Sequence, residues 1–140
     1  MNEFCKSVVE AIQRLGLTTG FPRWNVASEG ADLCVLRSDD VAVRVYLDVR
    51  DQAVTSALRF LNVPAELQED METHIICRFF DLNWDNGRSK SCLDERISVE
   101  LRQVMILLEK IGVMNTPLQT VFDFYQGYTQ AYNDYMSGQW

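Results

Sequence analysis

Residues 41–50 show the most regular alternation of apolar and polar side chains in the sequence. Apolar residues occupy every odd position, and polar or charged residues occupy most of the even positions, namely Arg44, Tyr46, Asp48 and Arg50. Because side chains alternate across a β-strand, this pattern predicts a strand with one buried face and one solvated face. The sheet that contains it should therefore present a structured, polar outer surface.

Two further segments are expected to pair with this strand. Residues 31–37 alternate in the same way and are separated from it by the polar turn Ser38-Asp39-Asp40, which predicts an antiparallel hairpin. Residues 53–61 are ambiguous, since their apolar positions fit either a strand or a helix. The short connection at Asp51-Gln52 favours the strand, because a meander extends a sheet through short turns.

The hydrophobic spacing before the sheet predicts an amphipathic helix over residues 2–15. Gly16 follows as a natural stop, and residues 18–22 read as a loop because Pro22 prevents a continued helix. After the sheet, Asn62 and Pro64 suggest the start of an acidic helix that runs to about Arg78. Its far end, residues 73–80, is dense enough in apolar side chains to form a buried strand instead, and residues 81–93 read as a loop.

Two helices are predicted to close the chain. The first spans residues 93–111 with a broad apolar stripe and ends at Gly112. The second begins after Thr116, with Pro117 in its first position and Gln119 completing a capping box, and Gly138 is expected to cap its end. The predicted fold is therefore α+β in a single domain, residues 1–140: an N-terminal helix, an antiparallel β-meander, and an α-helical C-terminal half packed on the sheet.

Composition narrows the class of partner. The 140 residues carry a net charge of −7, and residues 61–140 hold twelve acids against six bases. The densest acidic segment, residues 66–72, contains four acids and no base. Such a charge disfavours nucleic acid and anionic membranes as partners and favours basic proteins, although a solvated helix face would look the same.

The cysteines and the N-terminus bear on the compartment. Cys5, Cys34, Cys77 and Cys92 form no C-x-x-C pair, and charged residues interrupt the apolar positions near the N-terminus. No apolar run approaches the length of about 20 residues that a membrane span needs. Reduced thiols in a cytoplasmic protein are the expected state.

The sequence offers little equipment for catalysis, so we expect no catalytic residues, no cofactor and no metal site. His74 is the only histidine, which excludes a histidine-based zinc site, and phosphate-binding glycine loops and the nucleophile elbow are absent. On a helix, His74 could activate the thiol of Cys77 three residues later, but a buried cysteine beside a half-exposed histidine fits equally. Acid pairs such as Asp39-Asp40 and Asp94-Glu95 suit turns and helix starts.

Two other groups of acidic residues are candidate metal ligands. Residues 81–92 resemble a calcium loop faintly, but Gly87 falls one position late and Cys92 stands where a bidentate acid is needed. Asp48 and Asp51 lie close together at the expected turn between two strands, where aspartate is favoured for local hydrogen bonds. Neither arrangement predicts a metal site.

Aromatic residues crowd the last helix. A single helical face cannot bury all of them, and Phe124, Tyr128 and Tyr135 fall outside or beside the predicted apolar stripe. Tyrosine contributes a large contact area at low entropic cost and is enriched at binding hot spots. The alternative is a tyrosine-rich helix that simply covers its own sheet.

The stretch RSDDVAVRVYLDVRDQAV, residues 37–54 within the segment Ala31 to Pro64, resembles the sheet of small immunity proteins from bacterial polymorphic and contact-dependent growth inhibition toxin systems. These are acidic, cytoplasmic α+β proteins without catalytic motifs. The resemblance covers about a quarter of the chain. It implies that this protein neutralises a cognate toxin domain by direct protein–protein binding, and that the partner is often a basic nuclease. This protein is expected to be a monomer or a weak dimer.

We assign the expected interface to the acidic segment and the aromatic positions. The acidic steering surface and its neighbours comprise Glu66, Glu69, Asp70, Glu72, Asp81, Trp84 and Asp85. Tyr128 and Tyr135 of the last helix come second. Charge would speed the encounter, and aromatic anchors would set the lifetime of the complex.

Three alternatives remain open. A small acidic secretion chaperone also begins with a helix and a meander, and an obligate dimer in solution would favour it. A small hydrolase would use carboxylates or Cys77 and would need a concave pocket with at least two perturbed titratable groups. A structural or regulatory subunit of a larger assembly is the third.

Overall fold

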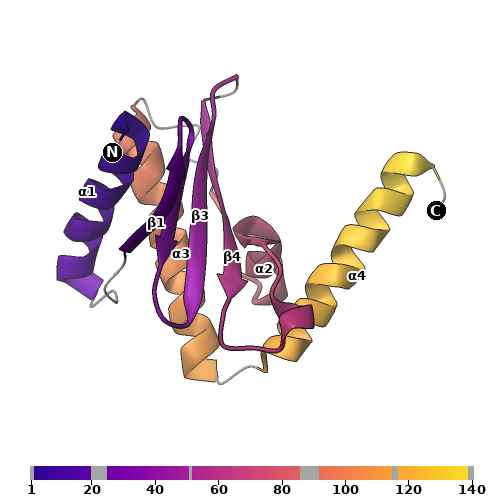
Figure 1. The fold of residues 1–140 in the computed structure, drawn as a ribbon. Helices are drawn as coiled ribbons and strands as arrows, with labels where there is room; N and C mark the ends of the chain where they lie inside the picture. Colours follow the sequence, from indigo (N-terminus) through magenta and orange to yellow (C-terminus); the bar gives the residue numbers. More distant parts are fainter. Residues whose placement is uncertain (1, 20–24, 51, 86–91, 115–116, 139–140) are drawn as a thin grey trace.

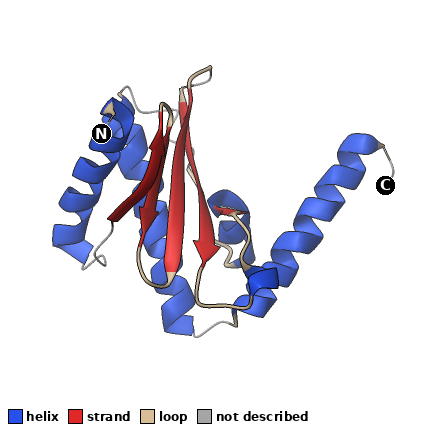
Figure 2. Cartoon of the chain, in the orientation of Figure 1, coloured by secondary structure: helices blue, strands red, loops and turns tan. Residues whose placement is uncertain are grey.

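The fold is described from a computed structural model, which covers residues 2–19, 25–50, 52–85, 92–114 and 117–138. One helix precedes the strands of the sheet, and the remaining long helices follow them (Figure 1, Figure 2). In chain order the elements are α1 (Glu3–Thr19), β1 (Asn25–Gly30), β2 (Leu33–Arg37), β3 (Val41–Asp48), β4 (Ala53–Phe60), the 3-10 helix η1 (Ala65–Leu67), β5 (Met71–Glu72), α2 (Thr73–Phe79), α3 (Leu93–Met114) and α4 (Leu118–Ser137). The predicted α+β class is confirmed.

The sheet is an antiparallel meander with strand order β1-β2-β3-β4-β5. Residues 53–60 form the strand β4, which pairs with β3 along its whole length from Val41–Phe60 to Asp48–Ala53. Two strands were not expected from the sequence. β1 has no clear alternation of apolar residues, and β5 consists of two residues that pair with β4.

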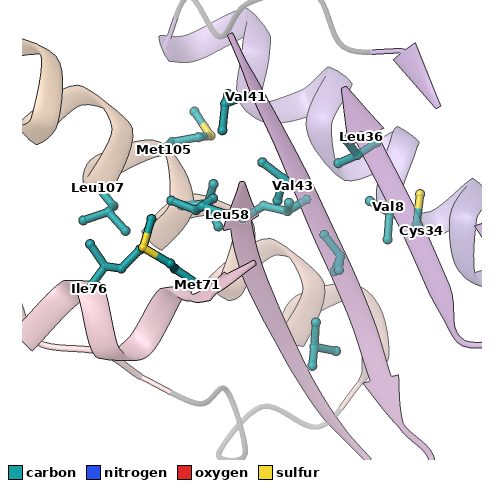
Figure 3. Packing of buried hydrophobic residues seen from close by; sticks show 14 of the residues in the cluster. Val8, Cys34, Leu36, Val41, Val43, Leu58, Met71, Ile76, Met105 and Leu107 are labelled. Atoms are coloured by element: carbon teal, nitrogen blue, oxygen red, sulfur yellow. The ribbon is translucent and has the colours of Figure 1, made fainter. Parts of the chain in front are cut away.

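The alternation in β3 works as the pattern predicts. Val43 and Val45 are almost fully buried on the inner face of the sheet, whereas Arg44 and Tyr46 on the outer face remain partly exposed. Figure 3 shows how inner-face residues of the sheet meet side chains from α1, α2 and α3. The labelled members of this core are Val8, Cys34, Leu36, Val41, Val43, Leu58, Met71, Ile76, Met105 and Leu107. Burial of this apolar surface is the main force that holds the layers together.

The helices cover one face of the sheet. α1 packs on α3 and β2, and both α2 and α3 pack on β4, whereas α4 contacts α2 and then extends away from the sheet (Figure 1). The opposite face of the sheet carries no described helix. Among the described helices, none combines the length and apolar character needed to cross a lipid bilayer.

Two predicted helix ends are wrong. α1 continues through Gly16 to Thr19, past the start of the expected loop, and α3 continues through Gly112 to Met114. A glycine inside a helix costs about 1 kcal/mol relative to alanine, which packing of the helix can offset. In α1 the buried residues Phe4, Val8 and Leu15 anchor the helix on the core up to its penultimate turn.

The continuous acidic helix expected from Pro64 to Arg78 is also wrong. The segment forms η1, the short strand β5 and the helix α2, so the alternative of a buried strand over residues 73–80 is wrong as well. The cause is tertiary: Met71 pairs with Leu58 and is 1% exposed, so its backbone extends the sheet before the helix begins. Helical spacing in the sequence could not reveal this pairing.

The last helix shows a mixed outcome. Gly138 caps α4 in the left-handed conformation with φ +77°, as predicted. α4 begins at Leu118 with Pro117 as its N-cap, so the prediction of Pro117 in the first helical position is wrong by one residue. The Gln119 side-chain amide donates to Asp123 at 2.9 Å, and Thr116, the other half of the expected capping box, lies outside the described residues. The apolar stripe is buried at Val121 and Tyr125, whereas Tyr132 and Met136 farther along are exposed.

Candidate functional site

The acidic segment lies at the β5 edge of the sheet, on and after η1. Glu66, Glu69 and Glu72 are all exposed there. Glu69 accepts a hydrogen bond from the side-chain amide of Gln126 in α4. Since an amide is neutral, this contact positions the Glu69 carboxylate without cancelling its charge. The fold therefore places the acidic segment directly beside the tyrosine-rich helix.

The hydroxyl of Tyr125 marks where these two surfaces meet. Burial raises the pKa of Tyr125, a hydrogen bond from the backbone of Glu72 lowers it, and the carboxylates of Glu72, Glu69 and Asp70 raise it. The three acids are thus close enough to act on one side chain of α4. This convergence joins residues that lie more than fifty positions apart in the sequence.

Asp70 differs from its acidic neighbours. Its Oδ2 lies 2.7 Å from Nη1 of Arg44, and its Oδ1 lies 2.9 Å from Nε of Arg59. Both arginines belong to the outer face of the sheet, so Asp70 neutralises charge within the chain. Its charge is therefore compensated within the chain, unlike the exposed carboxylates of Glu66 and Glu72.

The residues expected after α2 are fixed by the body of the protein. Trp84 is half-buried, its ring lies 5.1 Å from that of His74, and its Nε1–H donates to Oε2 of Glu100 at 3.2 Å. The backbone N–H and C=O of Asp85 both bond to the side chain of Gln103. Asp81 is exposed and adopts a positive φ of 56°. Trp84 therefore contributes to the packing of α2 and α3. The carboxylate of Asp81 is accessible to solvent.

The two predicted tyrosines occupy different environments. Tyr128 is half-buried: its ring stacks on Phe124 at 6.3 Å, and the guanidinium of Arg78 lies 5.4 Å from its centre. Tyr135 is 59% exposed on the part of α4 that extends away from the sheet (Figure 1). Phe124 also contacts Phe79 of α2, so α2 and the first half of α4 form one aromatic junction.

Sequence reasoning missed a buried polar network between β4, α2 and α3. Ser56 lies 2.6 Å from both Thr73 Oγ1 and Glu100 Oε1, and all three residues are at most 2% exposed. Burial raises the pKa of the Glu100 carboxyl to about 7, while hydrogen bonds from Ser56 and Trp84 favour its ionised form. One signal was available: Glu100 stands three residues after Ile97 and four before Val104, within the apolar stripe of its helix.

The thiol of Cys77 is poorly suited to nucleophilic chemistry. Burial, and to a smaller degree the charge of Glu100, raise its pKa to about 11, which keeps it protonated at neutral pH. His74 shares α2 with it, but burial lowers the pKa of His74, so a cationic imidazole that would stabilise a thiolate is disfavoured. Glu100 and Cys77 both have shifted pKa values, but both side chains are buried from solvent.

Within the described part of the chain, no cluster of histidine, cysteine and carboxylate side chains could hold a metal ion. The acidic turn residues make local contacts instead: Asp48 Oδ1 accepts a hydrogen bond from the Arg50 backbone at 3.0 Å, and Asp94 and Glu95 occupy the first turn of α3. Comparison of the chain with protein-family models, with curated proteins and with solved structures finds no match in any of the three.

Proposed function

We propose that this chain is an immunity-type binding protein, which neutralises a cognate toxin domain with a basic surface by direct contact. The observation that carries the proposal is the junction of the acidic segment with α4, where Glu69 accepts a hydrogen bond from Gln126 and the carboxylates of Glu72, Glu69 and Asp70 raise the pKa of the buried Tyr125. Acidic and aromatic side chains on one surface are the components that a protein-binding site for a basic partner needs.

Charge supplies the first step of binding. Glu66, Glu69 and Glu72 are exposed, and the net charge of −7 adds a long-range field of the same sign. Such a field raises the association rate with a basic domain and weakens as salt is added. Asp81 extends the acidic character beyond α2.

Aromatic contact supplies the second step. Tyr128 lies two residues after Gln126 in α4, and its ring already pairs with a guanidinium, that of Arg78. Arginines on a basic partner would find the same type of contact at the exposed ring of Tyr135. Contacts of this kind slow dissociation and so set the lifetime of the complex.

The partner class follows from the same chemistry. A nuclease domain needs a positive surface for phosphates, and an acidic protein seated on that surface would exclude the substrate. Inhibition would then require no reaction by this chain. A toxin of another activity with a basic surface would be held in the same way.

The test is the association rate with the purified toxin domain encoded beside this chain, measured at low and moderate salt. The triple variant E66Q/E69Q/E72Q should associate about tenfold more slowly at low salt, and the difference should shrink as salt rises. The control E3Q/E10Q/E109Q removes the same charge from exposed positions on α1 and α3. An equal loss in both variants, or no loss in either, would remove the acidic segment from the interface.

A secretion chaperone is the second candidate, because a helix followed by a meander opens the fold. The long closing helices α3 and α4 depart from that class. The two candidates differ in their effect on the bound domain. An immunity protein abolishes the toxin's activity in a purified mixture, whereas a chaperone holds the domain for export and forms an obligate dimer.

A further inference from the structure

Two surfaces of this molecule lie outside the buried core described above. The first is the outer face of the sheet, whose composition follows from the strand register. One row contains Leu33, Tyr46 and Thr55, the next contains Val35, Arg44 and Ala57, and the third contains Arg37, Ala42 and Arg59. This face thus combines three arginines with small apolar residues, of which Ala42 and Ala57 are at most 9% exposed, and β5 adds the exposed Glu72 opposite Ala57.

The outer face is less fully buried than the inner face. Leu33 and Val35 are half-buried and Arg37 is exposed, whereas Cys34 and Leu36 on the inner face are at most 2% exposed. Asp70 partly neutralises the cluster, since a single carboxylate binds both Arg44 and Arg59. The guanidinium of Arg37, at the other side of the same row, adds positive charge to this end of the sheet.

The second surface is the C-terminal half of α4, which extends away from the rest of the molecule (Figure 1). Tyr132 is 55% exposed and Met136 is 64% exposed. Four residues apart, they lie on one face of the helix, and Tyr135 beside them is exposed as well. We call this part of the helix, residues 128–137, the α4 arm.

The α4 arm is complementary in charge to the outer face of the sheet. α4 contains Asp123 and Asp134 and no lysine or arginine, and the C-terminal end of a helix carries a partial negative charge. The molecule already pairs a tyrosine of this helix with a cation, since Arg78 lies over Tyr128. Tyrosine rings and a negative helix end therefore suit a surface of arginines and apolar side chains.

The arm of one chain is directed away from its own sheet (Figure 1). We propose that it docks on the outer sheet face of a second copy, and that the second copy's arm docks reciprocally on the first. Exchange of this kind gives a closed dimer with two identical contacts. The core under the inner face is complete without the arm, so the dimer dissociates without unfolding. This inference rests on observations other than those behind the proposed toxin binding, although the arm includes Tyr128 and Tyr135, which that proposal assigns to the toxin.

Mass in solution tests the proposal directly. Sedimentation equilibrium of the full chain should show a monomer–dimer equilibrium that saturates at the dimer. The arm variant Y132S/M136S should raise the dissociation constant about tenfold or more, because it removes exposed anchors without touching the core. The sheet variant Arg37→Glu should have a similar effect, since it reverses the charge that the arm meets. Unchanged thermal unfolding confirms that both variants are folded.

A mixing experiment then separates arm-on-sheet docking from pairing of two arms. In a mixture of the two variants, the intact arm of the Arg37→Glu chain can still dock on the intact sheet of the Y132S/M136S chain. The mixture should therefore form heterodimers that hold one of the two contacts, although neither variant dimerises well alone. A monomeric wild-type chain, an unaffected arm variant, or a mixture that stays monomeric would each overturn the proposal. None of these outcomes depends on toxin binding.

Discussion

The hydroxyl of Ser56 lies 2.6 Å from Oε1 of Glu100, inside the interface between β4 and α3. The second carboxylate oxygen receives the indole N–H of Trp84. Hydroxyl, indole and amide donors thus meet a carboxyl group that is 2% exposed. The described contacts of this carboxyl group include no basic side chain, so burial dominates its ionisation and raises its pKa to about 7.

This relationship predicts a pH dependence of stability. In the unfolded chain Glu100 ionises near its ordinary pKa of 4.5, whereas in the folded protein it ionises near 7. The folded state therefore binds the proton more tightly, so the contribution of Glu100 is most favourable below pH 4.5 and is lost as the pH rises through about 7. The full loss is roughly 3 kcal/mol, on the usual value of about 1.4 kcal/mol per pKa unit.

The measurement is the free energy of urea unfolding between pH 4 and pH 8, compared with that of Glu100→Gln. Other carboxylates give slopes of their own, but these are common to both proteins and cancel in the difference. We expect the advantage of the wild type over the variant to shrink across this range. A difference that stays constant with pH would show that Glu100 ionises normally in the folded protein.

Trp84→Phe should destabilise the protein through one lost donor. The substitution keeps an aromatic ring beside His74 but removes the N–H that Glu100 Oε2 accepts. A buried acceptor left with poorer partners costs about 1–3 kcal/mol, and the cost should be larger above pH 7, where the carboxylate is charged. Urea unfolding at pH 5 and pH 8 measures both values. Val49→Ala, at a position 55% exposed, is the control and should change little.

The four cysteines should differ in reactivity. Cys5, Cys34 and Cys77 are buried, whereas Cys92 is exposed. Because burial raises the pKa of Cys77 to about 11, its thiolate is scarce at pH 8. Brief treatment of the native protein with iodoacetamide should label Cys92 alone, as read by intact mass, and Cys92→Ser should abolish labelling. Rapid modification of Cys77 would mean that α2 opens readily.

The centre of the core should respond strongly to truncation. Leu58 is fully buried where β4 faces Met71, Ile76 and Leu107 (Figure 3). Leu58→Ala should therefore cost about 2–5 kcal/mol, from lost burial and from the cavity that remains. Ile106→Ala removes an aliphatic side chain from α3 at a position 47% exposed, and should cost less than about 0.5 kcal/mol. Similar losses for both would contradict the inner-face packing.

Local pattern in the sequence was sufficient for the long elements. Alternation along residues 41–50 predicted β3 and the faces of its side chains, and helical spacing predicted α1, α3 and α4. It was sufficient because each of these elements buries one continuous face. The apolar residues of such a face recur at a regular spacing that can be read from the sequence. The candidate acidic and aromatic residues were likewise identified from the sequence, because each type is concentrated in one segment.

Their arrangement needed the tertiary structure. Sequence alone could not show that Asp70 is held by two arginines of the sheet, or that Trp84 is fixed by Glu100. It also could not predict β5, because Met71 is extended by pairing with Leu58 and not by its own neighbours.

The sequence by itself determined the long elements β3, α1, α3 and α4, because local periodicity decides them. The tertiary structure decided which charges are free, which face of the sheet stays uncovered and where α4 leaves the core. Those features depend on contacts between residues far apart in the chain, which no local pattern encodes.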